Sequence, residues 1–441
     1  MKAINIGICG LGTVGAGVVN VMQRNVASIA ARAGREVLIT HIGARRDNPA
    51  CDLGSTKISR DIFAVVNDPD VDIVVELIGG YEPALELVMQ AIANGKHVVT
   101  ANKALIAMHG NEIFAAADAR GVSVLFEAAV AGGIPIIKAI REGLAANSIE
   151  WLAGIINGTG NYILTEMRDK GRQFDDVLVD AQQLGYAEAD PTFDVEGIDA
   201  AHKLVILASL AFGMPLNFEA CFTEGISAIA PQDVIFAGEL GYRIKHLGIA
   251  RKVEQGVEMR VHPTLIPQRR LIANVDGVMN AVLVKGDAVG PTLYYGAGAG
   301  AEPTASSVIA DIVDVVRGID AEPINRVPAL GVAQQALSTL PTLSISDINT
   351  AYYLRINVSD QPGVLSHVTQ ILSDAGISIE AVLQKEVVQQ GVQSEQASRQ
   401  VPIVLITSQT LESQFMAAVK NIEALDVVQE SVHFIRVESL G

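Results

Sequence analysis

Short apolar runs alternate with stretches of helical periodicity over roughly the first third of the chain. The runs lie at residues 3–8, 37–43, 71–77, 97–100 and 122–126. Between the first two runs, apolar residues recur at helical spacing, which predicts a helix over 13–33. Strands that alternate with helices in this way form a doubly wound parallel sheet. We therefore expect an α/β fold here, in a first domain over residues 1–134.

The pattern changes near residue 135 and stays changed to about residue 300. Helices are expected around 135–145, 175–184 and 197–212, and strands around 257–265 and 281–285. This mixture predicts a second, mixed α/β domain over 135–300 that is inserted into the first. The amphipathic segment 304–318 predicts a helix that returns to the first domain and completes it over about 301–320.

The C-terminal part of the chain shows a third pattern. Residues 321–350 contain three prolines and little periodicity, which predicts a linker. Beyond it, strands are expected at 352–358, 377–384, 403–407 and 427–437, and helices at 364–375 and 411–424. This βαββαβ order predicts a ferredoxin-like unit over 351–441. The polar tract Gln389–Gln400 predicts a mobile loop inside it.

Composition and charge narrow the class of protein. The net charge of −17 argues against a nucleic-acid partner, because phosphate binding needs clustered lysine and arginine. The three cysteines, Cys9, Cys51 and Cys221, lack disulfide or zinc spacing and are expected to be small buried hydrophobes. The run 204–216 is shorter than the roughly 20 residues of a membrane span, and the N-terminus lacks signal-peptide features. We expect a cytoplasmic protein without a membrane partner.

A glycine-rich turn follows the first apolar run. It has the spacing G-x-G-x-x-G and comprises Gly10, Leu11, Gly12, Thr13, Val14 and Gly15. The glycines permit a tight turn and let main-chain N–H groups approach a pyrophosphate at the start of the next helix. A strand, this motif and a helix in succession predict a Rossmann-type dinucleotide-binding domain. A plain glycine turn is the alternative.

The end of the second predicted strand bears on the choice of dinucleotide. An acidic residue there would bind the ribose 2′-hydroxyl of NAD(H). This chain has Arg45 and Arg46 instead, and guanidinium groups suit a 2′-phosphate. NADP(H) is therefore favoured, and NAD(H) stays possible. Two solvated arginines without a ligand are the alternative.

Two lysines are candidates for chemistry. Lys103 follows the strand predicted at 97–100, at the edge where open α/β sheets bind ligands, although a surface lysine is the alternative. Asp199 and Lys203 are four residues apart and share one face of a predicted helix. That helix continues as the apolar run 204–210, which implies burial. Burial can tune both groups for acid–base work, and a helix-terminal ion pair is the alternative.

The most informative stretch runs from Ala181 to Lys203. Its pattern, Ala-x₃-Gly-Tyr-x₃-Asp-Pro-x₂-Asp-Val-x-Gly-x-Asp-x₃-Lys, resembles that of the homoserine dehydrogenase family without a gap. Residues 101–103, 154–162 and 296–300 resemble the family too, so the resemblance covers residues 1 to about 320. It implies a monofunctional enzyme that reversibly reduces L-aspartate 4-semialdehyde to L-homoserine with NAD(P)H. That reaction serves the biosynthesis of threonine, methionine and isoleucine. The domain over 135–300 would then bind substrate, catalyse and dimerise.

The resemblance also implies a role for each matching residue. Lys203 would be the proton donor and acceptor, Lys103 a second essential cation, and Asp199 would orient the reacting groups. The substrate-binding residues would be Gly185, Glu188, Asp194 and Asp199. The cofactor would touch Lys103 and Gly300 in addition to the glycine turn, Arg45 and Arg46.

Members of this family often bind a structural sodium ion through one carboxylate and several main-chain carbonyls. The matching residues here are Glu127, Val130, Gly132 and Ile134. Irregular, glycine-rich backbone after a strand can present carbonyl oxygens to a hard cation. Glu127 could equally cap a helix or be a buried, paired acid.

The segment from Asn357 to Leu365 resembles the corresponding turn of an ACT domain. Such domains commonly pair with another copy and bind an amino acid between the copies. This implies a homo-oligomer, a dimer or a tetramer, and an effector such as threonine. A dimerisation module without a ligand is the alternative.

Two rival functions are weighed against this assignment. Another semialdehyde or sugar dehydrogenase with the same nucleotide fold would not be expected to keep residues 185–203 intact. A non-catalytic amino-acid sensor would not be expected to keep Lys103, Glu188, Asp199 and Lys203.

Overall fold

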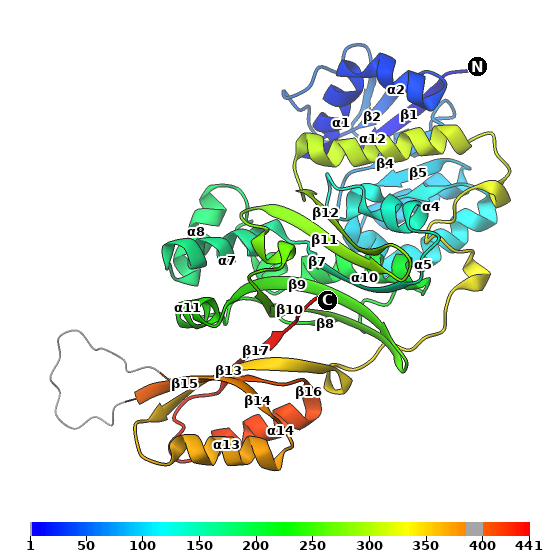
Figure 1. Ribbon diagram of the computed structural model, residues 1–441. Helices are drawn as coiled ribbons and strands as arrows, with labels where there is room; N and C mark the ends of the chain where they lie inside the picture. Colours follow the sequence, from blue (N-terminus) through cyan, green and yellow to red (C-terminus); the bar gives the residue numbers. More distant parts are fainter. Residues whose placement is uncertain (1, 385–399) are drawn as a thin grey trace.

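The computed structural model of the chain describes residues 2–384 and 400–441 (Figure 1). The loop predicted over Gln389–Gln400 lies outside the described residues, except for Gln400, which begins a strand. In the described part of the chain, no helix is long and apolar enough to span a membrane. The strands form two large sheets, one near the N-terminus and one that runs through the rest of the molecule.

The first sheet has six parallel strands in the order β3-β2-β1-β4-β5-β6. In chain order they are β1 (Ile4–Cys9), β2 (Val37–Gly43), β3 (Lys57–Ser59), β4 (Ile73–Glu76), β5 (His97–Thr100) and β6 (Val124–Leu125). The order reverses direction between β1 and β4, as in doubly wound dinucleotide-binding folds. The predicted fold class is therefore confirmed. Strand β3 was missed, because three residues do not make a readable apolar run.

Helices cover both faces of this sheet. They are α1 (Thr13–Arg24), α2 (Val26–Ala33), α3 (Phe63–Val66), α4 (Ala84–Ala93), α5 (Lys103–Arg120) and α12 (Ala301–Gly318). The prediction of one helix over 13–33 is wrong, because the backbone leaves the helical region at Asn25. As predicted, α12 returns to this sheet and packs along α1 (Figure 1). A Cβ at Gly17 would lie 2.4 Å from the Ala301 carbonyl oxygen, so only glycine permits this approach.

The second sheet has eleven strands along the path β12-β11-β7-β9-β10-β17-β13-β15-β14, with β8 beside β10 and β16 beside β13. Those of the middle part are β7 (Ile149–Ile155), β8 (Phe222–Thr223), β9 (Tyr242–Val253), β10 (Gly256–Pro267), β11 (Met279–Gly286) and β12 (Gly290–Ala297). Helix α10 (Ile198–Phe212) packs between this sheet and α5 of the first sheet. Most residues of this helix are buried, as predicted.

Five further helices belong to the middle part. They are α6 (Ile136–Lys138), α7 (Gly158–Lys170), α8 (Phe174–Gln183), α9 (Thr192–Val195) and α11 (Pro231–Glu239). The helix predicted at 135–145 is shorter than expected, because a π-helical turn replaces the α-helix over Ala139–Gly143. The helices α7 and α11 and several strands were not predicted individually.

The C-terminal unit has the predicted βαββαβ order, with one additional two-residue strand, β16, before its second helix. Its elements are β13 (Asn349–Ser359), α13 (Val364–Asp374), β14 (Ile379–Gln384), β15 (Gln400–Thr407), β16 (Thr410–Leu411), α14 (Glu412–Glu423) and β17 (His433–Val437). Its sheet is not separate, however, because β17 pairs with β13 on one side and with β10 on the other. Arg260 on β10 is fully buried and donates to Glu438, just after β17. The last strand therefore joins this unit to the middle sheet (Figure 1).

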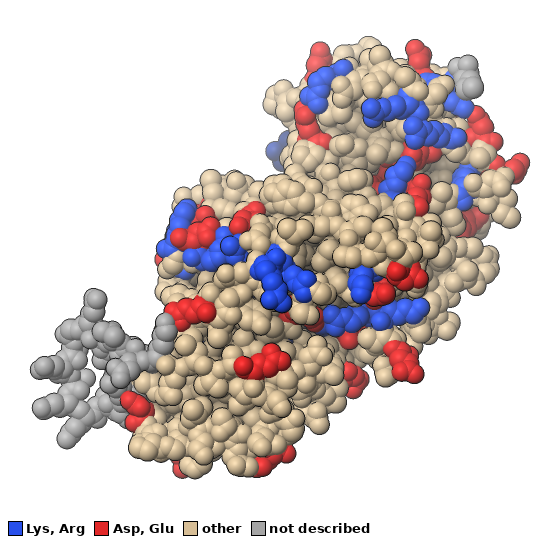
Figure 2. Space-filling model, viewed as in Figure 1, with Lys and Arg blue, Asp and Glu red and all other residues tan. Residues whose placement is uncertain are grey.

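Charged side chains are distributed unevenly over one face of the molecule (Figure 2). On the face shown in Figure 2, basic and acidic groups intermingle over the N-terminal and middle parts, and no broad basic patch covers that face. This face of the C-terminal unit is mostly uncharged.

Candidate functional site

The turn between β1 and α1 has the backbone that its glycines predict. Gly10 has a φ of +107°, and a Cβ there would lie 2.6 Å from the Leu77 carbonyl oxygen. A Cβ at Gly15 would lie 2.2 Å from the Gly10 carbonyl oxygen. A Cβ at Gly12, by contrast, would meet nothing within 4 Å. The first and third glycines thus serve the turn and its packing, and the second faces open space where a pyrophosphate can approach.

The loop after β2 is fastened to this turn. The side-chain amide of Asn48 donates to the Leu11 carbonyl over 3.0 Å. Arg45 and Arg46 lie in the same loop, and both are exposed. Asp47, the acid next to them, is paired with Arg60 at 2.9 Å. Among the described residues, neither Arg45 nor Arg46 forms an ion pair, so both guanidinium groups are free beside the dinucleotide turn. The sequence did not indicate the connection through Asn48.

Two lysines meet one carboxylate between α5 and α10. Lys103 is the first residue of α5, directly after β5, and its Nζ lies 3.0 Å from Oδ1 of Asp199. The Nζ of Lys203 lies 2.6 Å from Oδ2 of the same carboxylate. Lys203 also donates to the Ile156 carbonyl over 2.7 Å. The structure thus brings together all three residues predicted to be catalytic, and Lys103 is not an unpaired surface lysine.

Burial and charge give the two lysines opposite properties. Burial lowers the pKa of Lys203, and the nearby Asp199 offsets only part of that effect. The pKa of Lys103 is raised, chiefly by the charge of Asp199. Burial alone would raise the pKa of Asp199, but the two ammonium groups outweigh it and hold that pKa below its usual range. A lysine that readily gives up its proton therefore lies beside one that keeps it, which suits acid–base catalysis.

Asn157 connects this cluster to a second carboxylate. It is the N-cap of α7, and its Oδ1 accepts from the Gly160 N–H over 2.7 Å. Its Nδ2 donates to Asp194 over 2.8 Å and to Asp199 over 2.9 Å. The sequence placed Asn157 in a family-like stretch but gave it no role. An asparagine before a helix could have predicted the cap. It could not have predicted hydrogen bonds to two carboxylates from distant segments.

The other predicted substrate-binding residues lie near the lysines. Burial raises the pKa of Asp194, although the Asn157 hydrogen bond opposes this. Glu188 is exposed, in the turn between α8 and α9, and its charge contributes to the raised pKa of Lys103. Gly185 lies at the start of that turn with a φ of +74°, where its missing side chain leaves open space. The carboxylates of Asp194 and Asp199 therefore lie near both ammonium groups, and that of Glu188 lies near Lys103.

An aromatic group that the sequence did not indicate lies next to this cluster. The His202 ring on α10 stacks on Phe193 and Phe218, with ring centroids 5.4 and 4.4 Å apart. Its Nε2 lies 3.5 Å from the hydroxyl of Tyr81, which follows β4 in the first sheet. Burial lowers the pKa of His202 to about 4, so its ring is neutral near pH 7. These rings form an apolar wall of the site.

The predicted sodium ligands lie in the turn between β6 and α6. The carboxylate of Glu127 is buried and accepts from the N–H groups of Ile137 and Lys138 over 2.8 and 2.7 Å. Glu127 thus caps α6, as the alternative for this residue proposed. Its own N–H donates to the buried Asp311, and burial raises the pKa of Glu127 to about 7. No group of three or more His, Cys, Asp or Glu side chains suited to a metal occurs among the residues described.

Two glycine-rich segments cross beside this turn. A Cβ at Gly132 would lie 2.9 Å from the Gly298 carbonyl oxygen. Gly300 precedes α12 with a φ of +136°, so it begins the helix that packs on α1. Ala131 has a φ of +51°, which is unusual for a residue with a side chain. The close crossing places Gly300 near the N-terminal half of α1.

Comparison with known proteins agrees with this arrangement. Family models match in three segments: the NAD-binding domain of homoserine dehydrogenase at residues 10–127, homoserine dehydrogenase at 135–313, and the ACT domain at 352–424. A homoserine dehydrogenase of Pseudomonas aeruginosa is 63% identical over 441 residues, covering 100% of both chains. The chain belongs to the homoserine dehydrogenase family. Its activity is therefore the NAD(P)-dependent interconversion of aspartate semialdehyde and homoserine, a step of amino-acid biosynthesis.

Solved structures support the same conclusion. A homoserine dehydrogenase from Thiobacillus denitrificans is 61% identical, with a TM-score of 0.93 over 100% of this chain and 99% of that one. A hyperthermophilic archaeal homoserine dehydrogenase, solved in complex with NADPH, is 26% identical with a TM-score of 0.59. It covers 71% of this chain and 98% of its own. Both rival functions are thereby excluded.

Proposed function

We propose that Lys203 is the proton donor and acceptor of this homoserine dehydrogenase, and that Lys103 acts beside it as a permanent cation. The observation that carries the proposal is the buried carboxylate of Asp199, which lies within 3.0 Å of Lys103 and 2.6 Å of Lys203. A nicotinamide cofactor, when bound, would supply the hydride for the reduction. The ammonium of Lys203 donates a proton to the oxygen that becomes the hydroxyl, while Lys103 stabilises the developing negative charge. In oxidation, neutral Lys203 accepts the hydroxyl proton.

Replacing Lys203 by alanine tests this role. We expect kcat to fall by about 10²–10⁴ in both directions, the usual contribution of a positioned acid or base, with unchanged dinucleotide binding. Lys252→Ala is a matched control, because Lys252 is an exposed lysine on β9 with no place in the cluster. Near-normal turnover of Lys203→Ala would exclude Lys203 from proton transfer.

The acidic residues around the lysines suit the amino-acid part of the substrate. Homoserine carries an ammonium group, and Glu188 and Asp194 are carboxylates at the rim of the cluster. We assign ammonium binding to these two residues and orientation of the reacting end to Asp199. Gly185 would leave room for the main chain to approach the substrate.

NADP(H) is the cofactor that this chain is proposed to prefer, with NAD(H) as the alternative. Arg45 and Arg46 are exposed beside the glycine turn, and Asp47, which follows them in the chain, is engaged by Arg60. The relative solved with NADPH supports the same choice. Gly10 to Gly15 would hold the pyrophosphate, and Lys103 and Gly300 would lie along the cofactor.

A sodium ion in the turn after β6 is a further proposal. The Glu127 carboxyl group and the main-chain carbonyls of Val130, Gly132 and Ile134 are oxygen donors of the type that a hard cation prefers. The Gly132 and Ile134 carbonyls also accept hydrogen bonds from the Ser307 hydroxyl and the Ile136 N–H, so an ion would use their second lone pairs. The raised pKa of Glu127 at about 7 reflects a buried acid whose negative charge is not fully compensated. Sodium chloride should therefore raise the Tm more than choline chloride does, and Glu127→Gln should remove that difference.

The ACT unit is proposed to bind an effector amino acid, most plausibly threonine, in a homo-oligomer (dimer or tetramer) in the cytoplasm. Its link to the catalytic part supports regulation. Arg436 on β17 donates to Glu224 over 2.7 Å, and the Glu224 carbonyl lies 2.9 Å from Nε2 of His246. His246 in turn packs against Gly197, the residue that precedes α10. Assembly without an effector is the alternative.

A further inference from the structure

Asn157 occupies an unusual position among the groups that surround Lys203. Its Nδ2 donates to Oδ2 of Asp199, and the same oxygen accepts from Nζ of Lys203. The residue before it, Ile156, supplies the carbonyl that accepts from Lys203. One short segment at the end of β7 therefore contacts Lys203 directly and also contacts its counterion. Asn157 is 6% exposed, so water does not substitute readily for these contacts.

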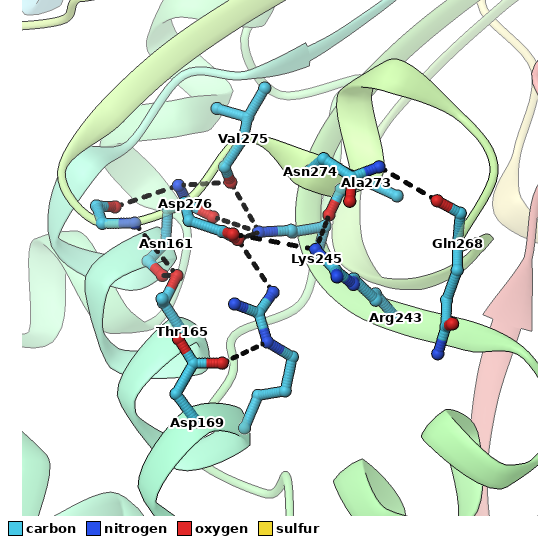
Figure 3. Close-up of polar contacts among 12 residues, drawn as sticks. Asn161, Thr165, Asp169, Arg243, Lys245, Gln268, Ala273, Asn274, Val275 and Asp276 are labelled. Carbon is cyan, nitrogen blue, oxygen red and sulfur yellow. Dashed lines mark hydrogen bonds and ion pairs between the residues drawn. The ribbon is translucent and has the colours of Figure 1, made fainter.

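The helix that begins just after Asn157 is itself held in place by polar contacts. Figure 3 shows polar contacts that link α7 with β9 and with the segment 273–276. Asn161, one turn beyond Asn157, donates to the carbonyls of Val275, Gly277 and Met279 over 3.0, 2.9 and 3.2 Å. The buried Lys245 donates to Asn161 over 3.1 Å and to Asp276 over 2.9 Å (Figure 3).

Close packing fixes the same turn. A Cβ at Gly158 would lie 2.8 Å from the Val278 carbonyl oxygen. The N-terminus of α7 thus cannot move toward or away from the active site without breaking several buried contacts. This rigidity is what a positioning residue needs from its support.

We infer that Asn157 is a positioning residue of the reaction, which holds Asp194 and Asp199 at a fixed separation and shares with Lys203 one oxygen of the Asp199 carboxylate. The inference rests on the proposed role of Lys203. Asn157 competes with Lys203 for one oxygen of Asp199, so it limits how strongly that carboxylate stabilises the ammonium form. The other charged groups that face Lys203 are Lys103 on α5 and Asp194 on α9.

Two substitutions separate this role from helix capping. Asn157→Ser keeps an oxygen that can cap α7 but removes the bridge between the two carboxylates. Asn157→Asp keeps the size and the cap but adds a negative charge beside Asp199. We expect kcat for homoserine oxidation to fall about 10- to 100-fold in Asn157→Ser, the cost of misplacing a reacting group, with dinucleotide Kd unchanged.

The pH profile supplies a readout that a purely structural role would not move. Oxidation requires neutral Lys203, so its rate rises with pH through the pKa of that lysine. Both substitutions should move the midpoint to higher pH, and Asn157→Asp should move it further, by about one unit, because an added carboxylate favours the ammonium form. Asn94→Ser, which loses a hydrogen bond to the Val66 carbonyl at the opposite edge of the first sheet, should change neither kcat nor the midpoint.

The outcomes distinguish failure of this inference from failure of the proposed function. If both Asn157 variants keep the wild-type midpoint while Lys203→Ala loses the titration, Lys203 transfers the proton and Asn157 has only a structural role. If Lys203→Ala keeps the wild-type titration, the proposed role of Lys203 is wrong, and the inference about Asn157 is overturned with it. Should Asn157→Ser fail to fold, the midpoint of the isosteric Asn157→Asp decides alone.

Discussion

Neutralising Asp199 should shift the pH dependence of catalysis in the acidic direction. Asp199→Asn keeps the size of the side chain but removes the charge that Lys203 contacts at 2.6 Å. At a charge separation of about 4 Å and an effective dielectric constant of about 20, that attraction amounts to about 4 kcal/mol, or about three pKa units. Asp194 remains nearby and water can enter, so we expect the pKa of Lys203 to fall by about one to two units.

The direction of the shift in the pH midpoint follows from the reaction. Homoserine oxidation needs neutral Lys203 and its rate rises with pH through the Lys203 pKa, so a lower pKa moves the midpoint of log kcat/KM to lower pH. The assay is dinucleotide reduction at saturating NADP⁺, measured from pH 6 to 11 in buffers of constant ionic strength. Asp175→Asn is the matched control, since it removes an exposed carboxylate on α8 outside the cluster. A midpoint that stays in place, or moves to higher pH, would refute the electrostatic reasoning, whatever happens to the maximal rate.

Three further results are expected. Replacing Arg45 and Arg46 together by alanine should weaken NADPH binding about tenfold or more relative to NADH binding, because charge-assisted hydrogen bonds to the 2′-phosphate are lost. Equal changes in the Kd of the two cofactors would contradict this. Burial lowers the pKa of Lys245 to about 8 in the folded protein, from 10.5. Between pH 8 and 10.5 the unfolded chain therefore binds more protons than the folded protein does. Folding thus becomes more favourable as the pH rises through that window. Denaturant titrations should show the unfolding free energy rising by about 2–3 kcal/mol there relative to Lys245→Met, and no relative rise would contradict it. Glu224→Gln should keep basal kcat but weaken a threonine response, while Glu219→Gln, at an exposed position, leaves it intact; an unchanged response in both would remove Glu224 from the coupling.

Features that depend on neighbouring residues could be predicted from the sequence. The glycine turn could be predicted because Gly10, Gly12 and Gly15 lie within six residues directly after an apolar strand. Gly15 packs against the Gly10 carbonyl only five residues away, whereas the contact of Gly10 with Leu77 is distant in the chain. The shared helical face of Asp199 and Lys203 follows from their spacing alone. Here the ion-pair alternative and the catalytic prediction describe the same contact, because the pair is buried next to a second lysine.

Features that depend on distant contacts could not be predicted. Lys103 reaches Asp199 only because α5 and α10 pack together. No local sequence pattern predicts that packing. The bridge made by Asn157 joins residues 37 and 42 positions away. The pairing of β17 with β10 is equally non-local, since an apolar strand does not indicate its partners.

The pairing of β17 with β10 affects how regulation by the C-terminal unit can be tested. Removing the chain beyond about residue 320 would separate the C-terminal unit in an ordinary two-domain protein. Here it would uncover the edge of β10 and remove Glu438 from the buried Arg260, which would keep only Glu258 as an ion-pair partner among the described residues. Removing one carboxylate from a buried network of charges is destabilising, because it leaves a buried positive charge less well compensated. A truncated chain would therefore lose stability as well as any effector response, so single substitutions such as Glu224→Gln are the more informative test.

The measurement that tests the central claim most directly is the pH–rate profile of homoserine oxidation for the wild type and Lys203→Ala side by side. If Lys203 transfers the proton, the wild-type rate rises with pH through a midpoint below the usual lysine range, because burial lowers the pKa of that residue. In Lys203→Ala the rate is about 10²–10⁴-fold lower than in the wild type, and that midpoint is absent. A Lys203→Ala enzyme that keeps the same midpoint, at any rate, would show that another group carries the proton.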